Sequence, residues 1–308
     1  MDLLAGSLTP LGGGYSGETF LAEAAGEQSV VRIYGERSAW RGPHAVEVDA
    51  AVLRLVRGLL PVAEVLELRR PDEVAGTPAV LVTSRLRGAR LDTVLPDAPG
   101  EHRRLVGGHL GRILGRLGTM PFLRAGMFVD GELRVGPMPD GGTDLVDWVK
   151  THLPATALTA WSERDRSALL GIAEEAESIL DQVDRVCLVH SDFNPKNLLV
   201  DPGTGKVTGL VDWEFAHAGS PYTDLGNLLR FDRDPDFTEA VLTTYTDVAP
   251  GLDTVDRQGV VDLARAADLW ALVDLAARRD ANQVARRAHD QLLAVVTTGD
   301  LHAAAGWT

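Results

Sequence analysis

The feature that most constrains this chain is a pair of short apolar runs near residue 200 that both lead into carboxylate or amide side chains. The first run, residues 186–189, is followed by a polar loop that carries Asp192 and Asn197, and then by more apolar residues. Fifteen residues beyond Asn197, another apolar run ends at Asp212. Between these runs, residues 201–205 (Asp-Pro-Gly-Thr-Gly) have the composition of a hairpin turn. Neighbouring strands would therefore bring three oxygen-bearing side chains together.

These three side chains suit one kind of chemistry. Phosphoryl transfer needs Mg²⁺ held by a carboxylate and an amide oxygen, together with a second carboxylate directed at the attacking hydroxyl. Taken alone, each residue is more simply explained by a turn or a loop cap. The spaced set as a whole favours phosphoryl transfer.

The first 85 or so residues predict a small sheet with one helix. Apolar residues recur at helical spacing over residues 43–58, with a glycine near the end as a stop signal. Strand-like runs occur on both sides of that helix, at residues 18–23, 29–34, 62–68 and 78–84. This pattern is typical of a small α+β lobe.

The remainder of the chain is mainly helical. Turn residues at 85–91 mark a hinge, and helical periodicity follows at residues 101–117, 163–184, 255–279 and 281–296. Residues 119–142 are rich in Gly and Pro, which predicts an irregular insertion or lid.

The motif His190-Ser-Asp-x-x-x-x-Asn, followed by Asp212-Trp-Glu and Asp224-Leu-Gly, resembles the aminoglycoside phosphotransferase and choline kinase family. That family is similar to eukaryotic protein kinases. The resemblance implies an α+β, two-lobed, protein-kinase-like fold. A small β-rich nucleotide-binding lobe would span residues 1–86, and a larger, mainly helical lobe for catalysis and acceptor binding would span residues 87–308.

The resemblance also assigns roles to the motif. Asp192 matches the catalytic aspartate, and Asn197 and Asp212 match the Mg²⁺ ligands. His190 and Asp224 are expected to support the loop rather than transfer protons. Most members carry glycine where this chain has serine at position 191, so the local geometry of the loop is open.

A glycine-rich segment is the candidate phosphate loop. Residues 12–17 satisfy G-x-G-x-x-G, but the residues that follow alternate like a strand, which favours a hairpin over phosphates and not a Rossmann turn. Gly13, Gly14 and Ser16 are therefore predicted to contact the nucleotide.

Three further positions complete the predicted nucleotide site. Arg32 stands where relatives often place lysine, so it is expected to contact the phosphates. Asp49 is favoured over Glu47 as its helix partner. Backbone groups near Ser84 and Leu86 resemble the segment that holds adenine, and both ATP and GTP remain open as co-substrates.

The charge of the chain limits its partners. Lys and Arg number 30 against 44 Asp and Glu, which gives a formal net charge of −14. Such a surface repels the backbone of nucleic acids and attracts cations, although acidity also serves solubility.

Acidic and aromatic residues in the second lobe suit a cationic acceptor, because carboxylates bind ammonium groups through charge-assisted hydrogen bonds. Together with the resemblance, they indicate a small cationic antibiotic whose phosphorylation confers resistance. Aminoglycosides and tuberactinomycin peptides such as capreomycin and viomycin are both candidates. The candidate acceptor residues are Asp147, Glu214, Asp232 and Trp270.

Two other functions fit the same residues. The chain could be a metabolic kinase for choline, homoserine or a similar alcohol. It could also be an inactive nucleotide-binding regulator, although the presence of Asp192, Asn197 and Asp212 argues against that function.

The sequence favours a cytoplasmic protein. No apolar stretch approaches roughly 18 uncharged residues, and no basic segment followed by an apolar core opens the chain. The single cysteine, Cys187, lies in an apolar run and fits a reducing compartment. We therefore expect no membrane partner, and no feature of the sequence indicates an oligomeric state.

Overall fold

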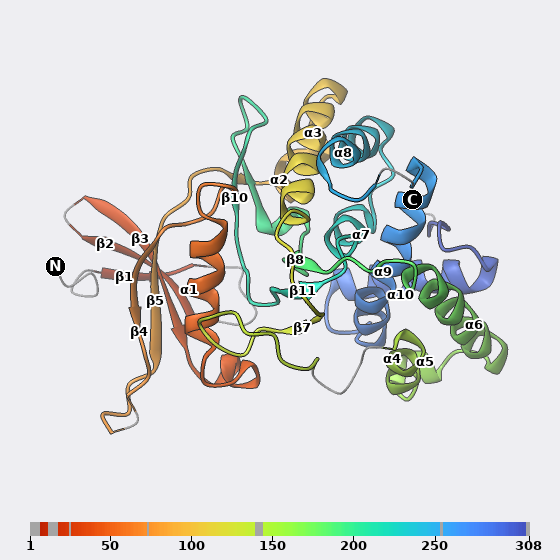
Figure 1. Cartoon of the computed structure of the whole chain (residues 1–308), viewed down its shortest axis with the longest axis horizontal. Helices are drawn as coiled ribbons and strands as arrows, with labels where there is room; N and C mark the ends of the chain where they lie inside the picture. Colours follow the sequence, from red (N-terminus) through yellow and green to blue (C-terminus); the bar gives the residue numbers. More distant parts are fainter. Residues whose placement is uncertain are drawn as a thin grey trace.

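The computed structural model describes residues 7–11, 18–24, 26–72, 74–138, 144–252 and 255–305. The predicted phosphate loop, with Gly13, Gly14 and Ser16, lies outside these residues. Figure 1 shows a sheet formed early in the chain beside a larger, mainly helical part. The expected α+β fold class, with a small β-rich lobe and a larger helical one, is confirmed.

The sheet of the small lobe has five antiparallel strands in the order β1-β2-β3-β5-β4. Val31 and Val82 lie opposite each other on the central strands and are fully buried, since β-branched side chains pack well on a pleated surface. The strands are β1 (Ser7–Pro10), β2 (Glu18–Ala24), β3 (Glu27–Tyr34), β4 (Val65–Arg69) and β5 (Ala79–Ser84).

A short 3-10 helix, η1 (Glu36–Arg41), leads into α1 (Ala45–Val56), which packs against this sheet (Figure 1). Val46 and Val52 of α1 share an apolar core with Leu81 of β5. Gly58, at φ 82°, turns the chain away just beyond the helix, in a conformation that glycine adopts without steric penalty.

The link between the lobes is fixed by strand pairing. Residues 85–88 lead to β6 (Ala89–Arg90), which pairs with β9 (Leu198–Val200) in a sheet of order β10-β9-β6. The third strand is β10 (Val207–Leu210). The strands on either side of the 201–205 turn are therefore tied to the end of the small lobe.

Two long helices pack closely at one end of the larger lobe. The chain passes from β6 through α2 (Leu91–Val94) and η2 (Leu95–Asp97) into α3 (Gly100–Leu117), which lies along α8 (Pro235–Val248). A Cβ atom added at Gly111 would lie 2.3 Å from the Val241 carbonyl oxygen, so only glycine permits this approach.

The other helices mostly begin at polar caps. The N-cap side chains of α4, α6, α8, α9 and α10 each accept a hydrogen bond from a backbone amide of the first turn, which satisfies groups that a helix leaves unpaired. Of these, α4 spans Leu145–His152, α6 spans Glu163–Leu180, α9 spans Arg257–Ala277 and α10 spans Gln283–Thr298. The two remaining helices, α5 (Thr156–Thr159) and α7 (Thr223–Leu229), begin without a side-chain cap.

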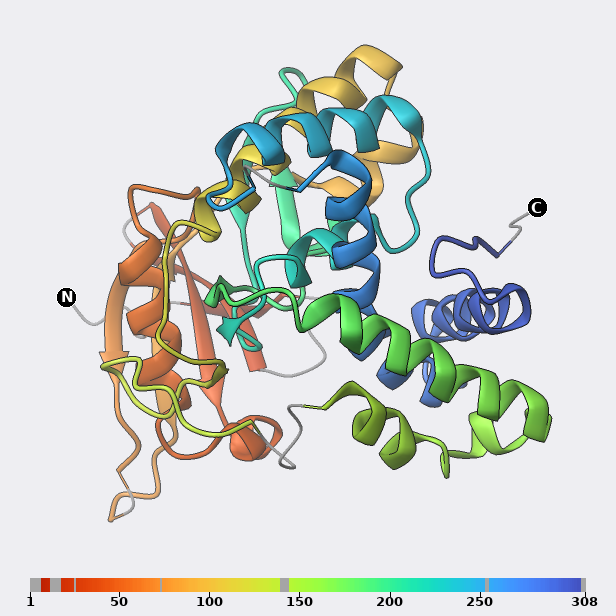
Figure 2. The same cartoon turned by 45° about the vertical axis from the view of Figure 1, so that its right-hand side comes forward.

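The glycine-rich segment that follows α3 connects the two lobes a second time. Its strand β7 (Gly126–Met127) joins a sheet of order β7-β11-β8, with β8 (Cys187–Val189) and β11 (His217–Gly219). The chain then crosses α1, and a Cβ atom added at Gly131 would lie 3.1 Å from that of Glu47. Figures 1 and 2 both show this crossing in yellow-green.

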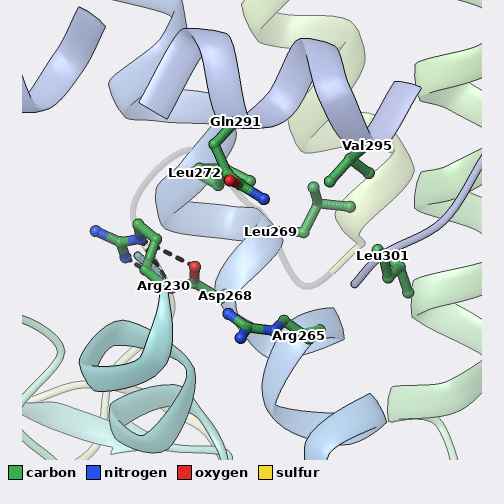
Figure 3. A pocket seen from close by; sticks show the side chains of 8 residues that line it. All are labelled: Arg230, Arg265, Asp268, Leu269, Leu272, Gln291, Val295 and Leu301. Atoms are coloured by element: carbon green, nitrogen blue, oxygen red, sulfur yellow. Dashed lines mark hydrogen bonds and ion pairs between the residues drawn. The ribbon is translucent and has the colours of Figure 1, made fainter. Parts of the chain in front are cut away.

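A buried ion pair joins the end of α7 to α9. The guanidinium of Arg230 donates to both oxygens of Asp268, at 2.7 Å from Nη2 and 2.9 Å from Nε. Figure 3 shows this pair beside a cavity of about 10 Å³, room for roughly one water molecule, that Arg265 and Gln291 also line. Among the described residues, no helix is long and apolar enough to cross a membrane.

Candidate active site

The polar loop of residues 190–197 joins two buried strands. It starts where β8 ends and closes with a 3-10 turn, η4 (Pro195–Asn197), that runs directly into β9. Cys187, Leu188 and Val189 are all buried, and so are Leu198 and Val200. The loop is therefore short and held at both ends by the core of the larger lobe.

Asp224, in the first turn of α7, fixes the start of this loop. Its carboxylate accepts hydrogen bonds from the backbone amides of His190 and Ser191, both at 2.7 Å. Burial raises the pKa of this carboxyl, and the charge of His190 and the two amides oppose that shift. Ser191 has φ 64°, in the left-handed region. Asp224 thus lies where a supporting residue was expected.

His190 connects the loop to the neighbouring segment. Its Nε2 lies 2.9 Å from the carbonyl oxygen of Val211, and its Nδ1 accepts from the amide of Asp192 at 3.2 Å. Full burial lowers the pKa of this imidazole, so the neutral form is favoured. A neutral ring that donates from Nε2 and accepts at Nδ1 satisfies both contacts. These bonds fit a loop organiser and not a proton carrier.

Asp192 is surrounded by donors. Asn194 donates to Oδ1 at 2.6 Å, Asn197 donates to Oδ2 at 2.8 Å, and the Lys196 ammonium lies 3.2 Å from Oδ2. The sequence argument gave Lys196 no role. Its position four residues after Asp192 in the same loop was the available signal.

Asp212 follows β10 and faces the small lobe. Its Oδ1 lies 3.3 Å from Nη1 of Arg32, and Nη2 of the same arginine lies 2.5 Å from Glu214 Oε2. Arg32 sits on β3, so these contacts bridge the sheet and the larger lobe. Burial raises the pKa of Asp212, as do the charges of Glu214 and Asp192, while Arg32 opposes the shift.

This crowding of anions indicates that the residues fit a cation. The side-chain nitrogen of Asn197 donates to Asp192, which leaves the side-chain oxygen of Asn197 for a cation. The Asp212 side chain is more exposed than that of the neighbouring Glu214. In the described part of the chain, no group of three His, Cys, Asp or Glu side chains has metal-binding geometry. The oxygen donors present, an amide and carboxylates, are nevertheless the kind that Mg²⁺ prefers.

The predicted partner of Arg32 lies elsewhere. Asp49 accepts from the hydroxyl of Tyr34 at 2.5 Å and forms a salt bridge with Arg41, with Nη1 at 2.8 Å. Glu47 is bonded to His44 and Arg70. Arg32 forms ion pairs with Asp212 and Glu214, and the charge of the nearby Asp49 also helps to raise its pKa. Arg41 takes the role expected of Arg32 because it approaches Asp49 from the preceding 3-10 helix.

The adenine segment is partly engaged in the sheet. The Ser84 amide donates to the carbonyl oxygen of Glu64 at 2.8 Å, and its hydroxyl accepts from the Glu64 amide at 2.9 Å. Leu86 lies in the linking segment, close enough to Gly209 that an added Cβ there would be 2.9 Å from it. Contact of either residue with adenine stays a prediction.

The four candidate acceptor residues do not form one cluster. Glu214 is buried against Arg32, and Asp147 is exposed and bonded to Lys150 at 2.9 Å. Asp232, whose pKa is raised by burial, caps the turn before α8 through the amide of Asp234. Trp270 lies on α9, where its carbonyl oxygen accepts from the indole of the α4 residue Trp148 at 2.9 Å.

A β-rich lobe and a helical lobe, with Asp192, Asn197 and Asp212 beside a bridging arginine, define the class of kinase-like phosphotransferases. The model of the phosphotransferase enzyme family matches residues 7–257. The chain therefore belongs to this family. The resemblance found in the sequence is confirmed.

Solved structures confirm the kinase-like fold. A thermostable mutant of aminoglycoside phosphotransferase APH(4)-Ia, in ternary complex with AMP-PNP and hygromycin B, has a TM-score of 0.65 and 19% identity, and 95% of this chain and 94% of that chain are covered. The GDP complex of a mutant aminoglycoside 2'-phosphotransferase-IIIa has a TM-score of 0.68 and 17% identity, with coverage of 95% and 92%.

Two curated relatives come from Mus musculus. Acyl-CoA dehydrogenase family member 10 is 23% identical over 254 residues, which cover 76% of this chain and 22% of that protein. Acyl-CoA dehydrogenase family member 11 is 36% identical over 55 residues, 18% of this chain and 7% of that protein. The chain thus spans about a fifth or less of the length of these relatives.

Proposed function

We propose that the chain transfers the γ-phosphoryl group of ATP or GTP to a hydroxyl of a small cationic molecule, with an aminoglycoside or a tuberactinomycin peptide as the first candidate. The observation that carries the reaction is the 190–197 loop, where Asp192 is held beside Asn197 and Lys196 and opposite Asp212. The solved structures with AMP-PNP, ADP and GDP support a nucleotide co-substrate.

In the proposed reaction, the acceptor oxygen attacks the γ-phosphorus and the bond from that phosphorus to the β–γ bridging oxygen breaks. The hydroxyl proton passes to the Asp192 carboxylate, and the nucleoside diphosphate leaves. Asn194 and Asn197 orient Asp192, since each donates to one of its oxygens. Lys196 is placed to offset charge on the transferred group.

Mg²⁺ would be held by Asn197 and Asp212, and when bound it supplies charge neutralisation of the phosphates. Arg32, already beside Asp212, would contact the phosphates from the small lobe. With the predicted lobe boundary near residue 86, the nucleotide would lie between these groups.

The proposal of a cationic acceptor is supported by the net charge of −14 and by the hygromycin B in the complex of a solved structure. The second candidate is a metabolic kinase for an alcohol such as choline or homoserine. It is favoured by one observation, namely that several acidic residues of the larger lobe are already partnered: Asp147 by Lys150, Glu214 by Arg32, and Asp268 by Arg230.

An acceptor panel tests both candidates. The purified protein would be incubated with Mg-ATP or Mg-GTP and with aminoglycosides, tuberactinomycins, choline and homoserine, and the release of nucleoside diphosphate would be measured. Phosphorylation of an antibiotic, with Asp192→Asn as the inactive control, supports the first candidate. Turnover confined to the small alcohols would replace it with the second, and no turnover with any acceptor would contradict both.

A further inference from the structure

A second hollow lies in the larger lobe, away from the 190–197 loop. Its volume is about 710 Å³, and its walls come from the ends of α3, α6 and α8 and the first turns of α9. Ile179, Val183, Leu252 and Leu263 supply apolar surface. Small-molecule pockets commonly measure roughly 300–1,000 Å³, so this hollow has room for an organic ligand.

One tyrosine in the wall of this hollow has a hydroxyl that forms no hydrogen bond within the part of the chain that the structure describes. Tyr222 lines the hollow and is only 4% exposed, yet no hydrogen bond of its hydroxyl exists within the described residues. Burial raises the pKa of this phenol. Its neighbour Tyr245, also in the wall, donates to the carbonyl oxygen of Pro221 at 3.2 Å. The Tyr222 hydroxyl can therefore form a hydrogen bond with a molecule bound in the hollow.

Charges around the hollow favour a cation. Asp184, Asp256 and Asp262 line it together with a single guanidinium, that of Arg185. Arg185 is itself held by the carbonyl oxygen of Gly118, at 2.6 Å from Nη2. Asp256 already accepts from the amide of Gly259, and Asp262 lies 2.8 Å from Nε2 of His302. Asp184 is therefore the carboxylate that most directly favours a ligand with an ammonium group.

We propose that this hollow is a second small-molecule site, which takes an organic ammonium ion with an apolar body and a group that hydrogen-bonds to Tyr222. The apolar walls would bury the body, and the carboxylates at the edge would face the charge.

The hollow also touches both segments that position the 190–197 loop. Tyr222 is the N-cap of α7, whose first turn carries Asp224. Asp184 and Arg185 lie just before β8, which ends at Val189, directly before His190. A ligand is therefore expected to change the rate of phosphoryl transfer. That expectation rests on the proposed function, whereas binding itself does not.

Binding is tested with three probes of one shape: 2-phenylethylammonium, 2-phenylethanol and phenylacetate. Saturation-transfer NMR and thermal shift would report affinity without any need for activity. We expect the ammonium ion to bind best and phenylacetate worst, with dissociation constants of roughly 1 mM for molecules this small. Asp184→Asn should weaken the binding of the ammonium ion and leave the binding of the alcohol unchanged.

Tyr222→Phe is the central variant. Because the hydroxyl forms no hydrogen bond within the described residues, its removal should leave the melting temperature of the free protein unchanged. The substitution should raise the dissociation constants of both the ammonium ion and the alcohol by about threefold to tenfold. Tyr245→Phe is the matched control: it removes a hydroxyl that bonds to Pro221, so it should lower the melting temperature and leave probe affinity unchanged.

Two further variants separate this site from the catalytic one. Asp192→Asn should not alter probe binding, and Val255→Trp, which fills the hollow, should abolish it while nucleotide still binds. The proposal is overturned if no probe binds at concentrations up to about 10 mM, which is well above the dissociation constants expected for such probes. It is equally overturned if Tyr222→Phe has no effect on affinity, or if Asp192→Asn alone removes binding. If the probes bind but the chain shows no phosphotransferase activity, only the proposed function fails.

Discussion

Backbone conformation at single residues marks the site. Among the described residues, only Leu133, Ser191 and Asp212 combine a side chain with positive φ. Two of these three lie at the site, at φ 64° and 66°. Such conformations persist where surrounding bonds enforce them, and here the Asp224 carboxylate holds the Ser191 amide. The left-handed turn at Ser191 is a conformation that glycine adopts without steric penalty, which fits the glycine expected there from the family resemblance.

Ser191→Gly should therefore raise the free energy of unfolding by about 0.5–1 kcal/mol, because glycine enters the left-handed region without a Cβ clash. Urea unfolding would measure it. Gly299→Ser, at φ 69° with open space around it, is the mirror control and should lose a similar amount. A less stable Ser191→Gly protein would show that the serine hydroxyl matters more than the backbone.

Asp192→Asn should lower kcat by at least about a hundredfold, because the amide cannot receive the acceptor's proton in the transition state. Nucleotide affinity and folding should change little, since the start of the loop is anchored by Asp224 and His190. Steady-state kinetics and a nucleotide-binding titration would test both halves. Asn194→Ala, which removes one donor but keeps the carboxylate, is the control and should retain far more activity. A kcat of Asp192→Asn within a few-fold of the parent would exclude the assignment.

Asn197→Ala and Asp212→Ala should reduce the gain in nucleotide affinity that Mg²⁺ gives, because each removes one oxygen donor. Titration with nucleotide, with and without Mg²⁺, measures that gain directly. Asp49→Ala offers a comparison, since its contacts with Arg41 and Tyr34 lie outside the predicted metal site. If both metal-site variants keep full activity at saturating Mg²⁺ and nucleotide, these residues are not the ligands.

At the scale of elements, periodicity predicted the long helices and strands, and local patterns missed the short ones. The helix predicted over residues 43–58 is α1 (Ala45–Val56), and that over 101–117 is α3 (Gly100–Leu117). In contrast, β6 has two residues and exists only because it pairs with β9, more than a hundred residues away. A strand of two residues is too short to show a hydrophobic period, so only the tertiary structure reveals it.

Buried charge is the other feature that local patterns hide. Asp268 is an acidic residue in a helix of the larger lobe, yet it is 3% exposed and bonded to Arg230. No pattern within α9 predicts the burial of Asp268, because its partner Arg230 follows a different helix, α7. The same difficulty affects Glu214, which was expected near the acceptor and is buried against Arg32.

Asp268→Asn should cost about 3–5 kcal/mol of unfolding free energy, since it leaves the buried Arg230 guanidinium without its counter-charge. Urea unfolding would measure the loss. The double variant Arg230→Met with Asp268→Leu should recover most of it, as both charges are then removed. Asp147→Asn breaks an exposed pair with Lys150 and should change the stability far less, because solvent screens that pair. Equal losses for the buried and exposed pairs would contradict this account.

Across the whole molecule, the spacing of the sequence predicted that polar residues of the larger lobe lie close together, whereas it did not predict contacts between the lobes. Asp192, Asn197 and Asp212 come together because two neighbouring strands deliver them, a relation that spacing alone can express. Arg32 and Asp212 are 180 positions apart in the sequence, and no local pattern in either segment indicates that their side chains meet. Asp49 was assigned to Arg32 by analogy, whereas Arg41 is the arginine that its position favours.

Acceptor binding should weaken as ionic strength rises, because a cation held by an acidic protein loses attraction when salt screens it. Calorimetric titration of the best acceptor at two salt concentrations would show the change. A neutral acceptor analogue serves as the control and should be insensitive to salt. Salt-independent binding, or an uncharged best acceptor, would favour the metabolic-kinase alternative.

The bridge from Arg32 to Glu214 has a consequence for the order in which ligands load. A nucleotide whose phosphates draw Arg32 away leaves Glu214 buried without a counter-charge, at a cost of about 3–5 kcal/mol unless another cation takes its place. A divalent cation carried by the phosphates would be that replacement. Nucleotide and metal are therefore expected to arrive as one complex, while the bare nucleotide competes poorly with a carboxylate already in position.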